Sequence, residues 1–264
     1  MIALAPVISD DLQINSANGN HFIKKKTSRL VSVLTYLAQT DEVEEEGSAE
    51  ATIAPGLSER ALLSTGIRIG TLVKTKSMAH FVSRTQANGL HVIDVSKTLG
   101  RIDIAAKFIA RSEIGRVVVY SAREYAKTPI EKFCEATGAI GLTGRFMPGT
   151  FTNPLYPHHL DPEIVMVADP AVDFQALDEA SKLGIPVVAV CDTDNVTASV
   201  DIVIPANNRG RSALAAIFWL LARYVLMHSG AITSEQQMKY TIEDFETKLV
   251  EEEDEGEELP FESS

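Results

Sequence analysis

The sequence predicts an α/β fold in which helices cover both faces of a mainly parallel sheet. Strand-like and helix-like segments alternate along the middle of the chain, which is typical of parallel strands joined by helical crossovers. Two strand-like runs, Ile-Val-Met-Val at 164–167 and Val-Val-Ala-Val at 187–190, lack polar alternation. Strands of this kind lie where both faces of the sheet are buried.

Six segments have the length and apolar content of strands. They span residues 89–95, 117–121, 139–142, 163–168, 186–191 and 201–205. We expect them to build a doubly wound sheet of the flavodoxin-like or Rossmann-like kind.

Helical periodicity appears in two of the intervals between these strands and again after the last strand. Apolar residues within 102–109 share one helix face, and those within 174–181 and 214–225 also repeat near helical spacing. Gly230 suits the end of the last helix.

The chain divides into three zones: an N-terminal extension at 1–59, an α/β core at 60–230 and an acidic C-terminal segment at 231–264. The extension is irregular, and its one apolar run, 30–37, fits a helix or a strand equally well. From Glu243 onward the chain is nearly all acidic. Such a segment cannot bury enough apolar surface to fold alone, so we expect a mobile tail.

Composition excludes several classes of protein. Apolar residues make up 45% of the 264 residues, which is enough for a full core. No apolar stretch reaches the roughly 18 residues that span a bilayer, and the N-terminus lacks the cationic start of a secretory signal. Cys134 and Cys191 form no CxxC unit, so we expect both to be small apolar side chains buried in the core. We therefore expect a cytoplasmic protein without membrane contact.

Charge is distributed unevenly along the chain. The net charge is −12, but residues 243–264 hold eleven Asp or Glu against one Lys, and residues 41–59 hold seven acids and no base. Residues 60–150 hold fourteen Lys or Arg against six acids. Because phosphate binding depends on local clusters of cations, this basic part of the core favours nucleic acid as a partner. The alternative is an evenly solvated charged surface.

The segment 141–154 is a shaped loop that follows a predicted strand. Its glycines and prolines exclude a regular element. It carries Arg145, Phe146 and Phe151 but no carboxylate, histidine or cysteine. This composition suits docking on phosphates and bases better than catalysis. The alternative is a rigid connection whose two phenylalanines pack in the core.

The carboxyl ends of the strands, where doubly wound sheets hold ligands, lack both common phosphate-binding loops. We therefore expect no cofactor. Asp192 and Asp194 stand one residue apart at a strand end and could hold Mg²⁺ for phosphoryl or glycosyl transfer. The alternative is a polar turn. His158 and His159 are adjacent, so they do not converge on one metal, and they favour contact with solvent or RNA.

Cations lie in two further places. Lys74 and Lys76 stand two positions apart at a predicted helix entry, and Arg84 follows eight residues later. Lysines two positions apart on a helix do not face each other, so these two act together only in an irregular segment.

The other group, Asn208, Arg209 and Arg211, opens the long apolar helix after the last strand. Cations at the start of a helix oppose its dipole unless an anion is present, so these arginines favour a bound phosphate. Asn207 or Asn208 can cap the same helix in either case.

Three motifs, in one order along the chain, resemble a family of ribosomal proteins. They are Ile69-Gly-Thr to Lys74-Thr-Lys76, the Gly-Arg-Phe-x-Pro-Gly-Thr-x-Thr-Asn signature at 144–153, and Ile-Pro-Ala-Asn-Asn-Arg-Gly at 204–210. The family is that of small ribosomal subunit protein two, which includes the bacterial protein of that number and the eukaryotic laminin-receptor-type protein. The Asn-Asn-Arg-Gly form is similar to the archaeal and eukaryotic branch. The resemblance covers about residues 62–230.

The resemblance implies a structural constituent of the small ribosomal subunit that is not an enzyme. It implies binding to ribosomal RNA and to neighbouring ribosomal proteins, and we expect no homo-oligomer. With the basic positions above, the residues expected to contact RNA are Lys74, Lys76, Arg84, Arg145, Phe146, Asn208, Arg209 and Arg211. Phe146 would either stack on a base or pack in the fold.

Two alternatives stand beside this hypothesis. One is a Mg²⁺-dependent transferase that uses Asp192 and Asp194, and the other is an interaction module that works through the acidic tail. One position also departs from the family pattern: Arg68 stands where relatives commonly have histidine, so any role of that histidine does not carry over.

Overall fold

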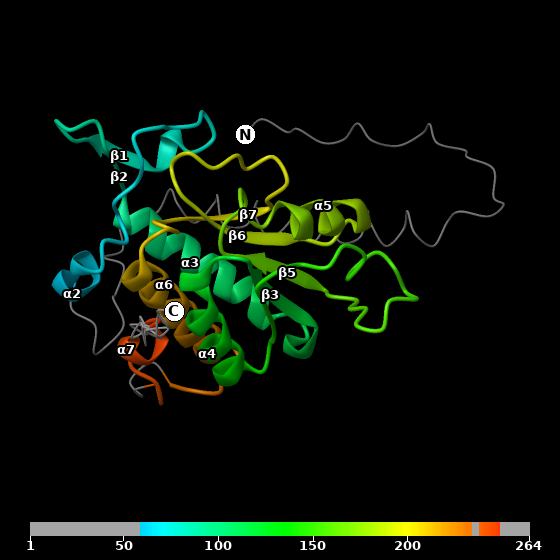
Figure 1. Cartoon of the computed structure of the whole chain (residues 1–264). Helices are drawn as coiled ribbons and strands as arrows, with labels where there is room; N and C mark the ends of the chain where they lie inside the picture. The colour runs from blue at the N-terminus through cyan, green and yellow to red at the C-terminus, as the bar shows by residue number, and fades with distance from the viewer. Residues whose placement is uncertain (1–58, 234–237, 249–264) are drawn as a thin grey trace, which may run out of the picture. The chain divides into compact units, whose positions relative to one another are not determined.

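The computed structural model describes residues 59–233 and 238–248. In that part of the chain, five parallel strands form one sheet in the order β4-β3-β5-β6-β7 (Figure 1). The strands are β3 (Val117–Ser121), β4 (Ile140–Thr143), β5 (Ile164–Val167), β6 (Val187–Cys191) and β7 (Ile202–Pro205). Counted from β3, this is the order 2-1-3-4-5 of flavodoxin-like doubly wound folds. The predicted fold class is confirmed, and five of the six predicted strands lie in this sheet.

Both faces of the sheet are buried, as the unbroken apolar runs predict. Val117 and Val119 of β3 point into one apolar layer, and Val118 and Tyr120 point into the other. Figure 1 shows α5 on one side of the sheet and α3, α4 and α6 on the other. The helices are α3 (Val95–Ala110), α4 (Lys127–Thr137), α5 (Phe174–Leu183) and α6 (Arg211–His228).

Local sequence explains where these helices begin and how they pack. The Asp94 carboxylate caps α3 by accepting from the backbone N–H of Ser96 over 3.1 Å. Helix α6 is buried from Ala213 to Ala222, since it is apolar on all sides. Helix α4 was not predicted, because its polar sequence buries only Pro129, Ile130 and Phe133 against the core.

The segment 89–95 was predicted as a strand of the main sheet, and that prediction is wrong. Only β2 (His91–Ile93) is extended there, and it pairs antiparallel with β1 (Val82–Thr85) in a separate two-stranded sheet (Figure 1). The backbone N–H of His91 donates to Thr71 and that of Ile93 to Arg68. The strand ends at Ile93 because the next residue, Asp94, caps α3.

The beginning of the acidic C-terminal segment packs on the core. Phe245, the last residue of α7 (Ile242–Phe245), is fully buried, and Nε1 of Trp219 donates to the carbonyl of Tyr240 over 2.8 Å. Residues 242–245, of which 243–245 were expected to belong to a mobile tail, therefore pack on the core as α7. A few aromatic side chains supply apolar surface that the acidic composition concealed.

The remaining described elements are α2 (Glu59–Ser64) and three short helical turns at Ala79–Phe81, Ile114–Arg116 and Glu124–Ala126. Among the described residues, no helix has the length and apolarity needed to cross a bilayer. The predictions for residues 1–58, for the run 30–37 and for the tail beyond 248 lie outside the described residues.

Candidate nucleic-acid interface

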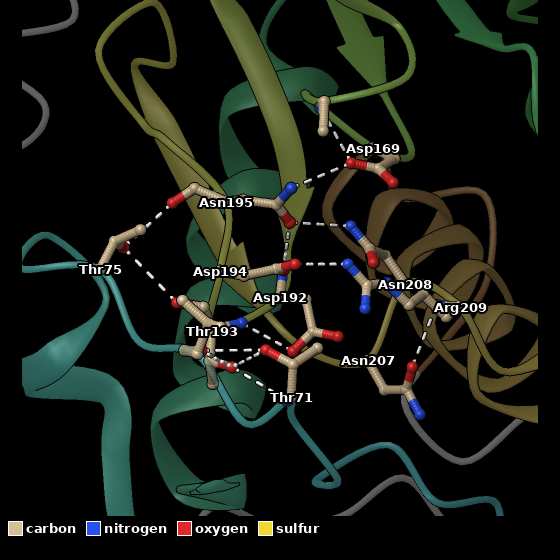
Figure 2. A network of polar contacts seen from close by, with 12 residues as sticks. Thr71, Thr75, Asp169, Asp192, Thr193, Asp194, Asn195, Asn207, Asn208 and Arg209 are labelled. Carbon is tan, nitrogen blue, oxygen red and sulfur yellow. Dashed lines mark hydrogen bonds and ion pairs between the residues drawn. The ribbon is translucent and has the colours of Figure 1, made fainter. Parts of the chain in front are cut away.

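A buried network of hydrogen bonds joins the carboxyl ends of β5, β6 and β7 (Figure 2). Asn195 lies at its centre: Oδ1 accepts from the Asp192 N–H over 2.6 Å and from Nδ2 of Asn208 over 3.0 Å. Its own Nδ2 donates to Oδ1 of Asp169 over 3.0 Å. Asn208 is fully buried and also donates to the carbonyl of Val190. The side chain of Asn208 therefore has a structural role in place of the predicted RNA contact.

The segment 70–77 packs against the turn that follows β6. The Thr71 N–H donates to Oγ1 of Thr193 over 3.0 Å, and the Thr193 hydroxyl donates to the carbonyl of Val73 over 2.9 Å. The Thr75 N–H donates to the carbonyl of Thr193 over 2.9 Å. These bonds fix an irregular segment in one conformation (Figure 2).

Gly70 allows this close approach. A Cβ atom at this position would lie 2.5 Å from Cγ2 of Thr193 and 3.0 Å from the carbonyl oxygen of His91. Only a residue without a side chain fits between them. The glycine of the first family motif thus sets the position of the segment that carries Lys74 and Lys76.

Asp192 and Asp194 are both engaged within the fold. Asp192 is buried, and its Oδ1 accepts from the Thr193 N–H over 2.6 Å. Burial raises the pKa of Asp192 to about 6. Asp194 forms an ion pair with Arg209. Within residues 59–233 and 238–248, no three His, Cys, Asp or Glu side chains are grouped to hold a metal ion. The arrangement fits the polar turn and not the metal site of the transferase alternative.

The usual ligand crevice of this fold lies where the strand order reverses, between the carboxyl ends of β3 and β5. In this chain, hydrogen-bonded side chains of Asp169, Asp173 and Arg123 lie at this place. The Asp173 carboxylate accepts from the N–H groups of Ala122 and Asp169 over 2.8 and 3.1 Å. Nε of Arg123 donates to Oδ2 of Asp169 over 2.7 Å. Buried carboxylates at this point oppose a phosphate, so the crevice does not suit a nucleotide.

The two arginines at the start of α6 face carboxylates of the same chain. Arg209 pairs with Asp194, and Nε of Arg211 donates to Oε1 of Glu246 over 2.8 Å. The Ser212 hydroxyl donates to the same oxygen of Glu246 over 2.8 Å. The dipole argument for a bound phosphate therefore does not hold here, because Glu246 supplies the anion.

The cations predicted near the start of the core, Lys74, Lys76 and Arg84, are exposed. Lys74, Lys76 and Arg84 have no ion-pair or hydrogen-bond partner for their side chains among the described residues. Lys74 and Lys76 lie on the docked segment 70–77, and Arg84 lies on β1. The irregular backbone that the lysine spacing requires is present.

Two cations that the sequence analysis did not select lie beside this group. The Lys97 ammonium donates to the carbonyl of His80, and the guanidinium of Arg101 lies 5.6 Å from the ring centre of Phe81. Burial lowers the pKa of His80, and the charges of Lys97 and Arg101 lower it further. The sequence signal was available: residues 66–101 hold six Lys or Arg and one acid, Asp94.

The loop 141–154 separates its cation from its aromatics. Arg145 is exposed, whereas Phe146 and Phe151 are buried, with their ring centres 5.1 Å apart. The Phe146 ring also lies 5.0 Å from that of Tyr120. Of the two roles open to Phe146, the structure shows packing.

Comparison with known proteins gives a consistent result. A family model described as ribosomal protein S2 matches residues 62–156 and 154–227. Small ribosomal subunit protein uS2 of Nitrosopumilus maritimus is 51% identical over 195 residues, which cover 74% of this chain and 94% of that protein. The protein of the same name from Cenarchaeum symbiosum is 50% identical over 196 residues, 74% of this chain and 94% of its own length. That from Thermoplasma acidophilum is 45% identical over 193 residues, 73% of this chain and 97% of its own length. Nothing in these matches supports the transferase alternative. The chain belongs to the ribosomal protein S2 family, in its archaeal and eukaryotic branch, and is a structural protein and not an enzyme.

Proposed function

We propose that this chain binds ribosomal RNA, as a structural constituent of the small ribosomal subunit, through a surface of unpaired cations. The structural role in the small subunit and in translation follows from the family. The basic surface, as we define it, consists of Lys74, Lys76, Arg84, Lys97 and Arg101. The observation that carries the proposal is that none of these five side chains has an ion-pair partner among the described residues.

Unpaired cations are suited to phosphate for an energetic reason. A cation that already pairs with a carboxylate must break that pair before it binds RNA, whereas an exposed and unpaired one releases only counterions from the phosphates. One acid, Asp94, lies within residues 66–101, and its carboxylate is engaged as the cap of α3. Cations therefore outnumber acids within residues 66–101, although the whole chain has a net charge of −12.

The basic surface is also held in place. The segment 70–77 is bonded to Thr193 and Asn195, which belong to the buried network of Figure 2. A surface that is ordered before binding loses less conformational entropy on binding RNA than a flexible one. Arg145 lies beyond the end of β4, at the carboxyl edge of the same sheet, and we include it as a further phosphate contact.

The remaining parts of the proposal concern location and neighbours. We place the protein in the cytoplasm, where two free cysteines, Cys134 and Cys191, stay reduced. We expect one copy in each small subunit, in contact with adjacent ribosomal proteins and without a homo-oligomer.

Sedimentation of cell lysate tests the function. The full chain with an affinity tag should migrate with intact small subunits in a sucrose gradient. Recovery of the chain only in the light fractions, while the subunits remain intact, would sink the proposal.

A variant tests the surface. Lys74→Glu with Lys76→Glu should lower occupancy in purified small subunits. Lys127→Glu is the matched control, because Lys127 is exposed at the start of α4, away from the five residues of the basic surface. Equal occupancy of both variants would show that these lysines do not face RNA.

A further inference from the structure

A pocket of about 140 Å³ opens beside Arg145, and no part of the proposed function accounts for it. Its lining includes two buried aromatic rings and four more exposed polar side chains: Tyr120, Phe146, Thr143, Arg145, Tyr156 and His158. The volume is well below the roughly 300–1,000 Å³ of a typical ligand pocket. It suits one planar ring system and not a whole nucleotide.

The pocket is preformed. The carboxylate of Glu179, on α5, accepts from the N–H of Gly149 over 2.7 Å and from that of Phe151 over 3.1 Å. The Tyr120 hydroxyl donates to the carbonyl of Gly144 over 3.0 Å. Gly144 and Gly149 have φ angles of 83° and 95°, which side-chain-bearing residues rarely adopt. These bonds and turns hold the loop open around the pocket.

The polar groups of the pocket are available to a ligand. The side chains of Thr143, Arg145, Tyr156 and His158 have no hydrogen-bond partner among the described residues. The Tyr156 and His158 rings meet edge to face, with centres 5.7 Å apart. Within the part of the chain that the structure describes, no carboxylate lines the pocket. The rings of Tyr156 and His158, unpaired donors and acceptors, and the Arg145 cation at the mouth are features that suit an unstacked base.

We propose that this pocket receives one unpaired nucleobase of ribosomal RNA, with Arg145 on an adjacent phosphate. This inference rests on the proposed function and names a second kind of contact, to a base and not only to the backbone. A side chain of a neighbouring protein is the competing occupant. The base is favoured because Arg145 has no carboxylate partner among the described residues, and because the pocket offers donors and acceptors to the hydrogen-bonding edge of a base.

Crosslinking within the assembled subunit tests the pocket. Tyr156 is replaced by p-azidophenylalanine, which keeps the ring, in the full chain incorporated into small subunits. After irradiation, primer extension should stop at one nucleotide that lies outside base-paired helices. The control places the same probe at Leu155, which is 91% exposed and does not line the pocket. A crosslink from position 156 to a ribosomal protein, or none at all, would overturn the proposal.

A second measurement does not depend on the probe. Thr143→Leu fills the pocket, and in subunits that contain it the crosslinked nucleotide should become roughly tenfold more reactive toward base-modifying reagents. Unchanged reactivity in subunits with full occupancy would reject the base pocket and leave the ribosomal role intact. Loss of the wild-type chain from small subunits would instead reject the proposed function itself.

Discussion

Lys74 and Lys76 differ from Arg209 and Arg211 in one respect that decides their roles. The lysines are exposed and have no partner among the described residues, whereas each arginine pairs with a carboxylate of its own chain. From the sequence, the arginines had the stronger physical argument for phosphate, since they open a helix. The comparison shows that a cation at a helix start indicates an anion nearby but not where the anion comes from.

The difference has an energetic side. Oδ1 of Asp194 is buried and has no hydrogen-bond partner among the described residues, so the ion pair of Oδ2 with Arg209 is the main compensation for burying this carboxylate. Moving Arg209 onto a phosphate would leave that carboxylate uncompensated. Binding of Lys74 or Lys76 to a phosphate carries no such cost. We therefore expect that replacing these lysines lowers RNA affinity, whereas replacing the arginines at the start of α6 lowers stability.

The largest effect is expected on RNA affinity. In Lys74→Glu with Lys76→Glu, affinity of the full chain for ribosomal RNA should fall by on the order of 100-fold at low salt. The slope of log affinity against log salt should decrease by about 2, one for each lost phosphate contact. Thermal unfolding should not change, because neither side chain packs in the core. Filter binding over a salt series measures this, and an unchanged slope would argue against phosphate contact.

Gly70→Ala breaks the support of the basic surface without removing a charge. The added Cβ meets Cγ2 of Thr193 at 2.5 Å, and we expect the free energy of unfolding to fall by about 1–3 kcal/mol. Thr193→Ser removes that methyl group, so the double variant should recover part of the loss. Gly115→Ala is the control, since nothing lies within 4 Å of its added Cβ. Equal stability of the two single variants would disprove the close packing.

A smaller effect is expected on the pH dependence of stability. It arises from Asp192, which lies in the buried network between the segment 70–77 and the start of α6. Burial raises its pKa to about 6, above the ordinary value of 3.8. Between these pH values the folded state keeps a proton that the unfolded state releases. The contribution of Asp192 to stability is therefore complete below about pH 4 and lost above about pH 6.

Asp192→Asn keeps the acceptor for the Thr193 N–H and removes this titration. The stability of the variant relative to the wild type should rise between pH 4 and 6.5, by on the order of 1–3 kcal/mol. Urea unfolding at both pH values measures it. A relative stability independent of pH would mean that Asp192 is ionised in the fold like an exposed carboxylate.

The smallest effect is the coupling energy of the Arg211–Glu246 ion pair, which distinguishes Arg211 from Lys74 and Lys76. A double-mutant cycle of Arg211→Met and Glu246→Gln should give a coupling of about 0.5–1 kcal/mol, as for a partly exposed ion pair. Arg211→Met should leave the salt slope of RNA binding unchanged. A lower salt slope in Arg211→Met, together with no coupling energy between Arg211 and Glu246, would show that Arg211 contacts RNA.

The sequence predicted the sheet well for a physical reason. The run 117–121 became β3 with the predicted bounds, because an apolar run buried on both faces has no other stable position. The run 89–95 failed because its hydrogen-bond partners come from Thr71 and Arg68, on an irregular segment that has no periodicity. Pairing of that kind depends on tertiary contacts and leaves no local pattern.

The candidate site was predicted in part. Three of the five cations of the basic surface, Lys74, Lys76 and Arg84, were selected, because local charge is visible in the sequence, whereas Lys97 and Arg101 were not. The roles of Arg211 and Asn208 were not, since Glu246 lies 35 positions from Arg211 and Asn195 lies 13 from Asn208. From the sequence we expected Glu246 in a mobile tail, whereas in the structure the preceding residue, Phe245, is buried and Glu246 bonds Arg211 and Ser212 at the start of α6.

A density map of the native small subunit tests the central claim most directly. We predict that Nζ of Lys74 and of Lys76 lie within about 4 Å of phosphate oxygens of ribosomal RNA, while Arg211 remains paired with Glu246. A map in which the segment 70–77 faces solvent or another protein, and the arginines at the start of α6 contact the RNA, would contradict the account.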